Sequence, residues 1–158
     1  MSRRETVCVW VVSVVFAFVF CLYSVERHNR FNSSALDLGI QDNVLWNTAH
    51  GRWFQSSLET PNYLGDHVSL TLPFFSLAYL IREDVRVVLI LQSLLLSLSA
   101  VVVAHLAARR IQAPWAGLCF ALAFLFYPPL GFINRFDFHP VAAVIPLFLL
   151  AIYCFEIK

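Results

Sequence analysis

Long runs of apolar residues without a charged side chain constrain this chain more than any other feature. A helix needs about twenty mainly apolar residues to cross the ~30 Å hydrocarbon core of a bilayer. Four runs reach or approach that length: residues 6–25, 87–108, 113–133 and 141–157. Only 13% of the residues are charged, whereas a soluble domain carries about a quarter. We therefore predict an all-α integral membrane protein with about four transmembrane helices in a single domain.

The residues before the first run predict its orientation. Arg3 and Arg4 precede the run, which places the N-terminus in the cytoplasm under the positive-inside rule. A cleavable signal peptide is the alternative, but the run is long for one and no small-x-small cleavage site follows it cleanly. We expect a multi-pass protein of the cell membrane.

Residues 26–86 are polar enough to form a long first external loop. Within it, residues 68–81 are apolar but short and contain Pro73, so we expect an interfacial or re-entrant segment rather than a span. In that arrangement the loop and the polar break at residues 134–140 face the same side. If residues 68–81 crossed the membrane instead, the loop before them and the break would face opposite sides.

A short amphipathic helix is predicted over about residues 35–50 of this loop. Leu36, Ile40 and Val44 recur every four residues, which is the spacing of one helical face. Ser34 precedes them as an N-cap and Gly51 follows as a stop. Such a helix can lie on the membrane surface with its polar face toward a site.

Four residues of the loop can carry chemistry or serve only the fold. Asp37 lies three residues after Ser34, so it is either the acid of a capping box or a catalytic base or metal ligand beside the membrane. His50 and the pair Asp66-His67 are likewise either surface turns or parts of a site.

The segment Phe136-Asp137-Phe138-His139-Pro140 joins the third and fourth runs. In an extended segment, residues two apart point the same way, so we expect Asp137 and His139 on one side and the two rings on the other. Polar groups at a membrane boundary are costly unless paired or hydrated, and they suggest function. An interfacial loop with aromatic anchors is the alternative.

The predicted topology places the acids and imidazoles of both segments at one face of the membrane. Their oxygen and nitrogen atoms suit Mg²⁺ or Mn²⁺ better than a soft metal, although no cofactor follows with certainty. The net charge of +1 gives no ground for a nucleic-acid partner. The residues concerned are Asp37, His50, Asp66, His67, Asp137 and His139.

Several motifs resemble the signatures of a prokaryotic family of polytopic membrane proteins of unknown function. That family is similar in layout to the GT-C glycosyltransferases, which take sugars from polyprenyl-phosphate carriers. The motifs, in chain order, are Asp37-Leu38-Gly39, Gln41-Asp42, Trp46-Asn47-Thr48-Ala49-His50-Gly51, Asn62-Tyr63-Leu64-Gly65-Asp66-His67 and Phe136-Asp137-Phe138-His139-Pro140.

The resemblance implies a catalytic acid soon after the first helix, which Asp37 matches, and a second acidic motif that Asp137-Phe138-His139 resembles. His139 replaces the second acid of that motif, so a metal held by Asp137 and His139 does not follow directly. Arg135 is a candidate contact for the phosphate of the carrier; the alternative is a side chain that extends from a helix end to the membrane interface. The further residues expected to bind substrate are Gln41, Trp46, His50 and His67.

Members of such families run to several hundred residues, so we expect this chain to be an N-terminal fragment. The expected function is transfer of a sugar from a polyprenyl-phosphate carrier to an acceptor on the external face, with membrane lipids as partners. The alternative is a non-enzymatic membrane protein, either a transporter component or a lipid-binding scaffold. A transporter would place ionisable groups near mid-membrane, whereas here the charge lies at the ends of the runs.

Overall fold

The computed structural model describes residues 1–59 and 61–157, and these are helical with short connections. Within the described residues there is no strand, only an isolated bridge between Gln55 and Asn62. The all-α class predicted from the sequence is confirmed. The elements are α1 (Arg3–Asn29), α2 (Asp37–Ala49), η1 (Tyr63–Gly65), α3 (Leu72–Ser76), η2 (Leu77–Leu80), α4 (Arg86–Ile111), α5 (Ala116–Leu125), α6 (Pro128–Arg135), η3 (Pro140–Ala143) and α7 (Val144–Glu156).

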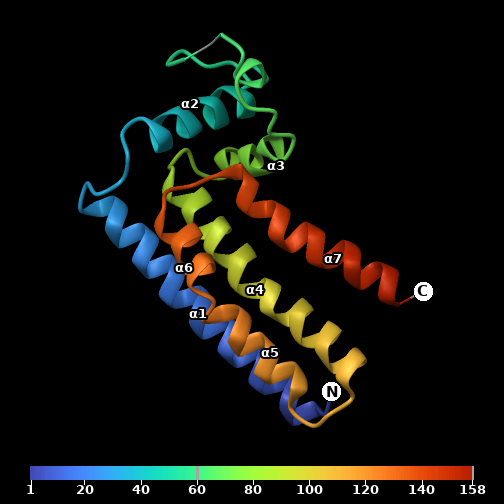
Figure 1. The fold of residues 1–158 in the computed structure, drawn as a ribbon. Helices are drawn as coiled ribbons and strands as arrows, with labels where there is room; N and C mark the ends of the chain where they lie inside the picture. The colour runs from blue at the N-terminus through green and yellow to red at the C-terminus, as the bar shows by residue number, and fades with distance from the viewer. Residues whose placement is uncertain (60, 158) are drawn as a thin grey trace.

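Four helical rods form a bundle: α1, α4, the pair α5 and α6, and the pair η3 and α7. Within it, α4 contacts α1, α5 and α7 (Figure 1). Both α1 and α4 are long and apolar enough to cross a membrane. At ~1.5 Å per residue, each exceeds the ~30 Å of a hydrocarbon core. Helix α1 leaves most of its large side chains exposed, including Val11, Val15 and Phe18. Such a surface is costly in water and is stable against lipid tails.

The third rod is broken. Helices α5 and α6 are bent by 46° relative to one another. The bend falls where Pro128 and Pro129 open α6, because a proline ring in a continuing helix would clash with the preceding turn and remove a hydrogen bond. Together the pair is apolar and long enough for one further span.

The fourth rod, Pro140–Glu156, is apolar but shorter than the other spans. By length and composition the described residues therefore hold two spans, or three if the bent pair is one. The count of four, with its boundaries, stays a prediction.

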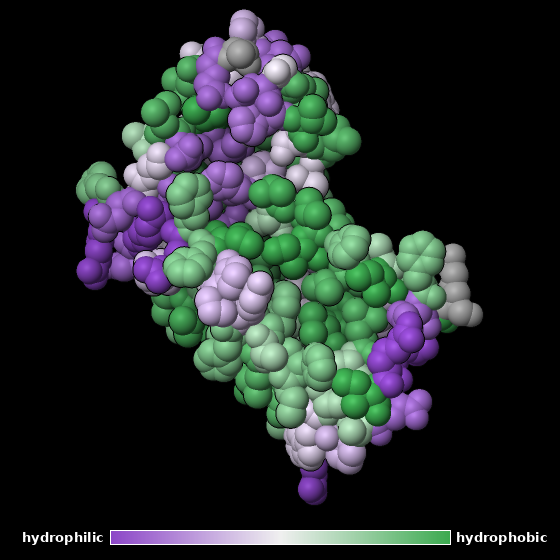
Figure 2. Space-filling model, viewed as in Figure 1, coloured by the Kyte–Doolittle hydropathy of each residue, from purple (hydrophilic) through white to green (hydrophobic). Residues whose placement is uncertain are grey.

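Residues 30–85 form a cap over one end of the bundle (Figure 1). Helix α2 lies across the cap and packs on α3 and η2. Residues 68–81 contain no single long helix but only the short turns α3 and η2. Figure 2 shows hydrophobic side chains covering the rods, with hydrophilic ones gathered over the cap and at the far end.

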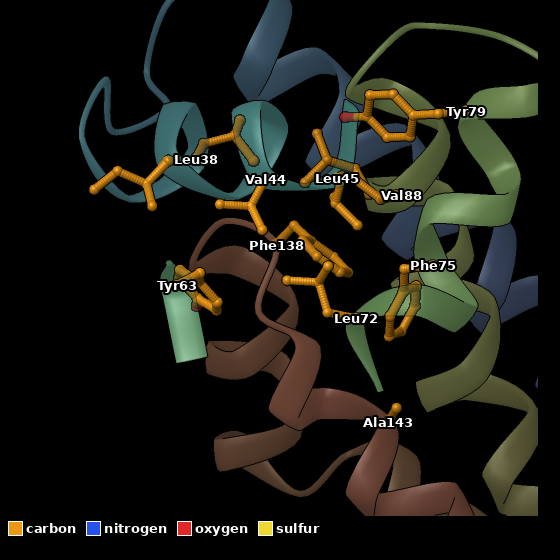
Figure 3. Packing of buried hydrophobic residues seen from close by; sticks show 12 residues of the cluster. Leu38, Val44, Leu45, Tyr63, Leu72, Phe75, Tyr79, Val88, Phe138 and Ala143 are labelled. Atoms are coloured by element: carbon orange, nitrogen blue, oxygen red, sulfur yellow. The ribbon is translucent and has the colours of Figure 1, made fainter. Parts of the chain in front are cut away.

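The cap is fixed to the bundle by a ring from the other end of the sequence. Phe138, in the connection between α6 and η3, is fully buried and packs edge-on against Phe75 at 4.7 Å between ring centroids. Figure 3 shows Phe138 among buried residues of the cap, with Leu45 on α2 and Leu72 on α3 nearby. One hydrophobic core therefore joins segments that are far apart in the chain.

Candidate functional site

A cavity of about 140 Å³ opens where the cap meets the start of η3. We name it the rim pocket. Its wall combines apolar surface with two carboxylates, two imidazoles, an amide and a phenol. The described residues that line it are Asp37, Ile40, Gln41, Glu59, Tyr63, His67, Ser69, His139, Pro140 and Val141.

Asp37 begins α2, and its carboxylate is exposed toward this pocket. Its backbone N–H donates to Ser34 Oγ at 3.1 Å. The N-cap position is nevertheless Leu36, which has no side-chain cap, and not Ser34 as predicted. In a capping box the acid would accept from Ser34 N–H in return, but that N–H donates to Asp137 Oδ2 at 2.7 Å. No described residue donates a hydrogen bond to the Asp37 carboxylate, so it is available to a ligand.

Gln41 lies one turn further along α2 and is 7% exposed. Its Nε2 donates to the Tyr63 hydroxyl at 2.6 Å. Its Oε1 is buried and accepts no hydrogen bond from a described residue. A buried acceptor without a donor costs about 1–3 kcal/mol. Gln41 Oε1 is therefore a candidate to accept a hydrogen bond from a bound molecule.

Tyr63 and His67 form the wall opposite α2. Their rings stack at 5.4 Å between centroids, and His67 Nδ1 lies 2.8 Å from Asp66 Oδ2. Burial raises the pKa of Tyr63, and nearby Glu59 and Asp66 raise it further against the hydrogen bond from Gln41. The phenol therefore stays protonated and can donate.

Asp137 is placed differently from Asp37. Its side chain is 2% exposed, and its Oδ1 accepts from Arg27 at 2.6 Å, while Oδ2 accepts from Ser34. Gln92 braces the same segment, since its Nε2 donates to the Asp137 carbonyl and its Oε1 accepts from His139 N–H at 2.9 Å. The carboxylate thus ties α1, the cap and the α6–η3 connection together.

The sequence suggests Asp137 and His139 as ligands of a metal ion. Among the described residues, no three His, Cys, Asp or Glu side chains are grouped as a metal site would require. Both Asp137 oxygens already accept from protein donors. The residues present therefore do not fit a bound Mg²⁺ or Mn²⁺.

The predicted alternation of side chains in this segment is wrong. Phe136 is 55% exposed and lies against the His139 ring at 5.1 Å between centroids, whereas Phe138 is fully buried. The two rings do not share a side. The reason is that Phe138 packs into the apolar core of the cap, whereas Asp137 pairs with Arg27 of α1.

A larger groove of about 570 Å³ adjoins the rim pocket and shares His139 and Val141 with it. We name it the side groove. Its other described lining residues are Tyr23 and Arg27 of α1 and Phe132, Ile133, Arg135 and Phe136 at the end of α6. It therefore combines an apolar wall with two guanidinium groups.

Arg135 lies over the Tyr23 ring at 5.3 Å, and its Nε donates to the Tyr23 hydroxyl at 3.2 Å. No described carboxylate pairs with it. Arg27, in contrast, is shared with Asp137. The free positive charge of the groove is therefore that of Arg135.

Trp46 and His50 do not line the rim pocket. They stack on each other at 4.2 Å and both reach Glu83, Trp46 Nε1 at 2.9 Å and His50 Nε2 at 3.3 Å. Arg52 lies over the indole. This cluster links the end of α2 to the segment that precedes α4. It lies on a different part of the cap from the rim pocket.

Sequence reasoning missed Glu59 and Tyr63 as pocket residues. Tyr63 lies inside one of the motifs, but no spacing indicates which of its residues faces Gln41. Glu59 carries no local signal at all. Both reach the pocket through the tertiary path of the loop.

Comparison with known proteins gives one match. Residues 27–157 match the model of a family described as "Predicted membrane protein (DUF2079)". No curated protein and no solved structure matches the chain.

Proposed function

The chain belongs to the DUF2079 family of predicted membrane proteins, and we propose that it forms the rim site of a membrane-embedded transferase. In this proposal a sugar moves from a polyprenyl-phosphate carrier to an acceptor held in the rim pocket on the external face. The layout of the GT-C glycosyltransferases is the model for it.

One observation carries the proposal. The unpartnered Asp37 carboxylate lies in a pocket with several polar side chains, and this pocket directly adjoins an apolar groove with a free guanidinium. A lipid-linked sugar phosphate has the same order of parts, namely an apolar tail, a phosphate and a polar sugar. The tail fits the side groove, Arg135 suits the phosphate, and the sugar would reach the rim pocket.

The chemistry follows from these positions. An acceptor oxygen or nitrogen attacks the anomeric carbon of the sugar, and the bond from that carbon to the phosphate oxygen breaks. The electron pair of the broken bond stays on the phosphate, whose negative charge Arg135 stabilises. Asp37 takes the proton from the acceptor as general base. His139, at the boundary of the two cavities, is the remaining group positioned to contact the sugar.

Asp137 acts as a positioning residue in this proposal, because its carboxylate is buried among protein donors. It holds Arg27 and the segment that carries His139. Gln41 and His67 bind the acceptor or the sugar. No step is assigned to Trp46 or His50.

The test is mass spectrometry of the lipids that co-purify with the protein, compared between wild type and Asp37→Asn. We expect a polyprenyl-phosphate sugar on the wild type and more of it on the variant, since turnover stops while the groove is intact. Asp42→Asn is the matched control, because Asp42 lies on the same helix but accepts from Tyr79 at 2.5 Å instead of lining the rim pocket. Bulk phospholipid alone on all three would overturn the transferase and favour the lipid-binding scaffold.

A further inference from the structure

We infer that the rim pocket selects a ligand that carries a primary ammonium group. The inference rests on the proposed function in that it assigns a chemical class to the occupant of the same pocket. It concerns recognition only and adds no reaction step.

The first ground is the charge of the wall. Asp37 and Glu59 both line the pocket, and no described residue pairs with either carboxylate. None of the described lining residues is lysine or arginine. A neutral, hydroxyl-rich ligand would leave the two like charges of the pocket wall uncompensated, whereas a cation offsets them.

The second ground is the buried amide oxygen of Gln41. Gln41 lines the pocket, and its Oε1 is buried and lacks a donor among the described residues. An ammonium group has three N–H donors and no acceptor. It can therefore satisfy two carboxylates and this amide oxygen at once, which a hydroxyl with a single donor cannot do.

The two imidazoles do not already supply that cation. His67 is held by Asp66 at 2.8 Å and stacked on Tyr63, so any positive charge on it is offset there. His139 packs against Phe136 at the boundary with the side groove. Neither ring donates to Gln41 Oε1.

The third ground is size. Ligand pockets that enclose a whole small molecule measure about 300–1,000 Å³, whereas the rim pocket measures about 140 Å³. It holds a head group, and the remainder of the molecule extends into the side groove. The ammonium group could be that of an amino sugar or that of an ethanolamine head group.

The test measures binding of two matched sets of probes to the full chain in detergent by isothermal titration calorimetry at neutral pH. The first set is ethanolamine, ethylene glycol and choline. Ethylene glycol lacks the charge, and choline keeps the charge but has no N–H donor. The second set is glucosamine, glucose and N-acetylglucosamine.

We expect the free amine to bind roughly tenfold more tightly than its partners in at least one set, as charged hydrogen bonds imply. Preference within the first set identifies an ethanolamine head group, and preference within the second an amino sugar. Equal binding of amine and neutral probes in both sets would overturn the inference.

Glu59→Gln is the informative variant, since it removes one charge at an exposed position without touching the proposed base. It should weaken amine binding several-fold and leave neutral probes unchanged. Glu26→Gln is the control, because Glu26 lies at the same rim but pairs with Arg30 outside this pocket. If amines bind but no lipid-linked sugar co-purifies, the transferase fails and the inference stands; if the sugar is found without amine preference, only the inference fails.

Discussion

At the scale of single residues, the two acids of the motifs have different tasks. Asp37 is left without a protein partner, whereas Asp137 is one of the most enclosed charged groups in the chain. The sequence placed both at a membrane boundary but could not distinguish them, because the partner of Asp137 on α1 lies 110 residues away. Only the fold shows which carboxylate is free.

The ion pair between Arg27 and Asp137 should contribute to stability. Asp137→Ala strands a guanidinium that is only 26% exposed and should lower the free energy of unfolding by about 3 kcal/mol, the lower end for a broken buried pair. Asp137→Asn keeps an acceptor for Ser34 N–H and should cost less. Unfolding in mixed micelles measures both.

Glu26→Ala is the matched comparison. Its pair with Arg30 is largely exposed on both sides, so the loss should stay within about 0.5 kcal/mol. Equal losses for Asp137→Ala and Glu26→Ala would contradict the structural role of Asp137.

Asp84 gives a pH dependence. Burial by itself would raise the pKa of Asp84, but hydrogen bonds and charge from Arg86, together with the charge of Arg82, lower it below its usual value. A lowered pKa stabilises the folded state fully above the unfolded value of about 3.9 and loses that effect as the pH falls through the folded value. The stability advantage of wild type over Asp84→Asn should therefore be constant near neutral pH and shrink below about pH 4. Thermal unfolding across pH checks this, and an unchanged difference at low pH would count against it.

At the scale of elements, the sequence indicated more than at single residues. Helix α2 occupies Asp37–Ala49, where a helix over residues 35–50 was expected, because its four-residue spacing is a local signal. The bend between α5 and α6 falls at prolines that the sequence shows plainly. The sequence predicted only some of the residues of the rim pocket. Asp37, Gln41, His67 and His139 line it together. The other predicted residues Trp46, His50 and Asp137 contact other partners. Which residues of a loop converge depends on its path, and spacing does not encode that.

The packing of α5 against α4 depends on a glycine. A Cβ at Gly117 would lie 2.9 Å from the Ala104 carbonyl oxygen and 3.0 Å from Glu5 Oε1, and Glu5 also accepts from Gly117 N–H. Gly117→Ala should therefore destabilise the protein by about 1–3 kcal/mol through overpacking.

Gly131, in α6, is the control for that change. A Cβ there meets no atom within 4 Å, so Gly131→Ala should be neutral or stabilise by up to about 1 kcal/mol. The two variants are compared by their unfolding free energies, and a harmless Gly117→Ala would show that α5 can move away from α4.

At the scale of the whole molecule, the structure has a polar cap at one end of an apolar bundle. The far end is tied by Arg109 and Arg110, which both contact Glu156 and so fasten α7 to α4. That arrangement makes the orientation testable. Single cysteines at Gln55, in the cap, and at Ala113, between α4 and α5, should react with a membrane-impermeant maleimide from opposite sides once the native cysteines are replaced.

Labelling of both positions from the same side would contradict the bundle as a membrane-spanning unit. Labelling of Gln55→Cys from the cytoplasm alone would instead reverse the predicted orientation. The positive-inside rule places the N-terminus in the cytoplasm, so we expect Gln55→Cys to react from the external side.

The burial of Phe138 in the cap also has a consequence for synthesis of the chain. The first loop leaves the ribosome with Leu72 and Phe75 already made, but the ring that completes their core follows roughly sixty residues later, which takes about 3–12 s at ~5–20 residues per second. During that interval the core of the cap lacks the Phe138 ring and has only its other members, such as Val88 and Leu89 of α4. The cap should therefore depend on a chaperone or on the membrane surface until the third rod has been inserted, and chains stalled before Phe138 should be the ones that proteases remove first.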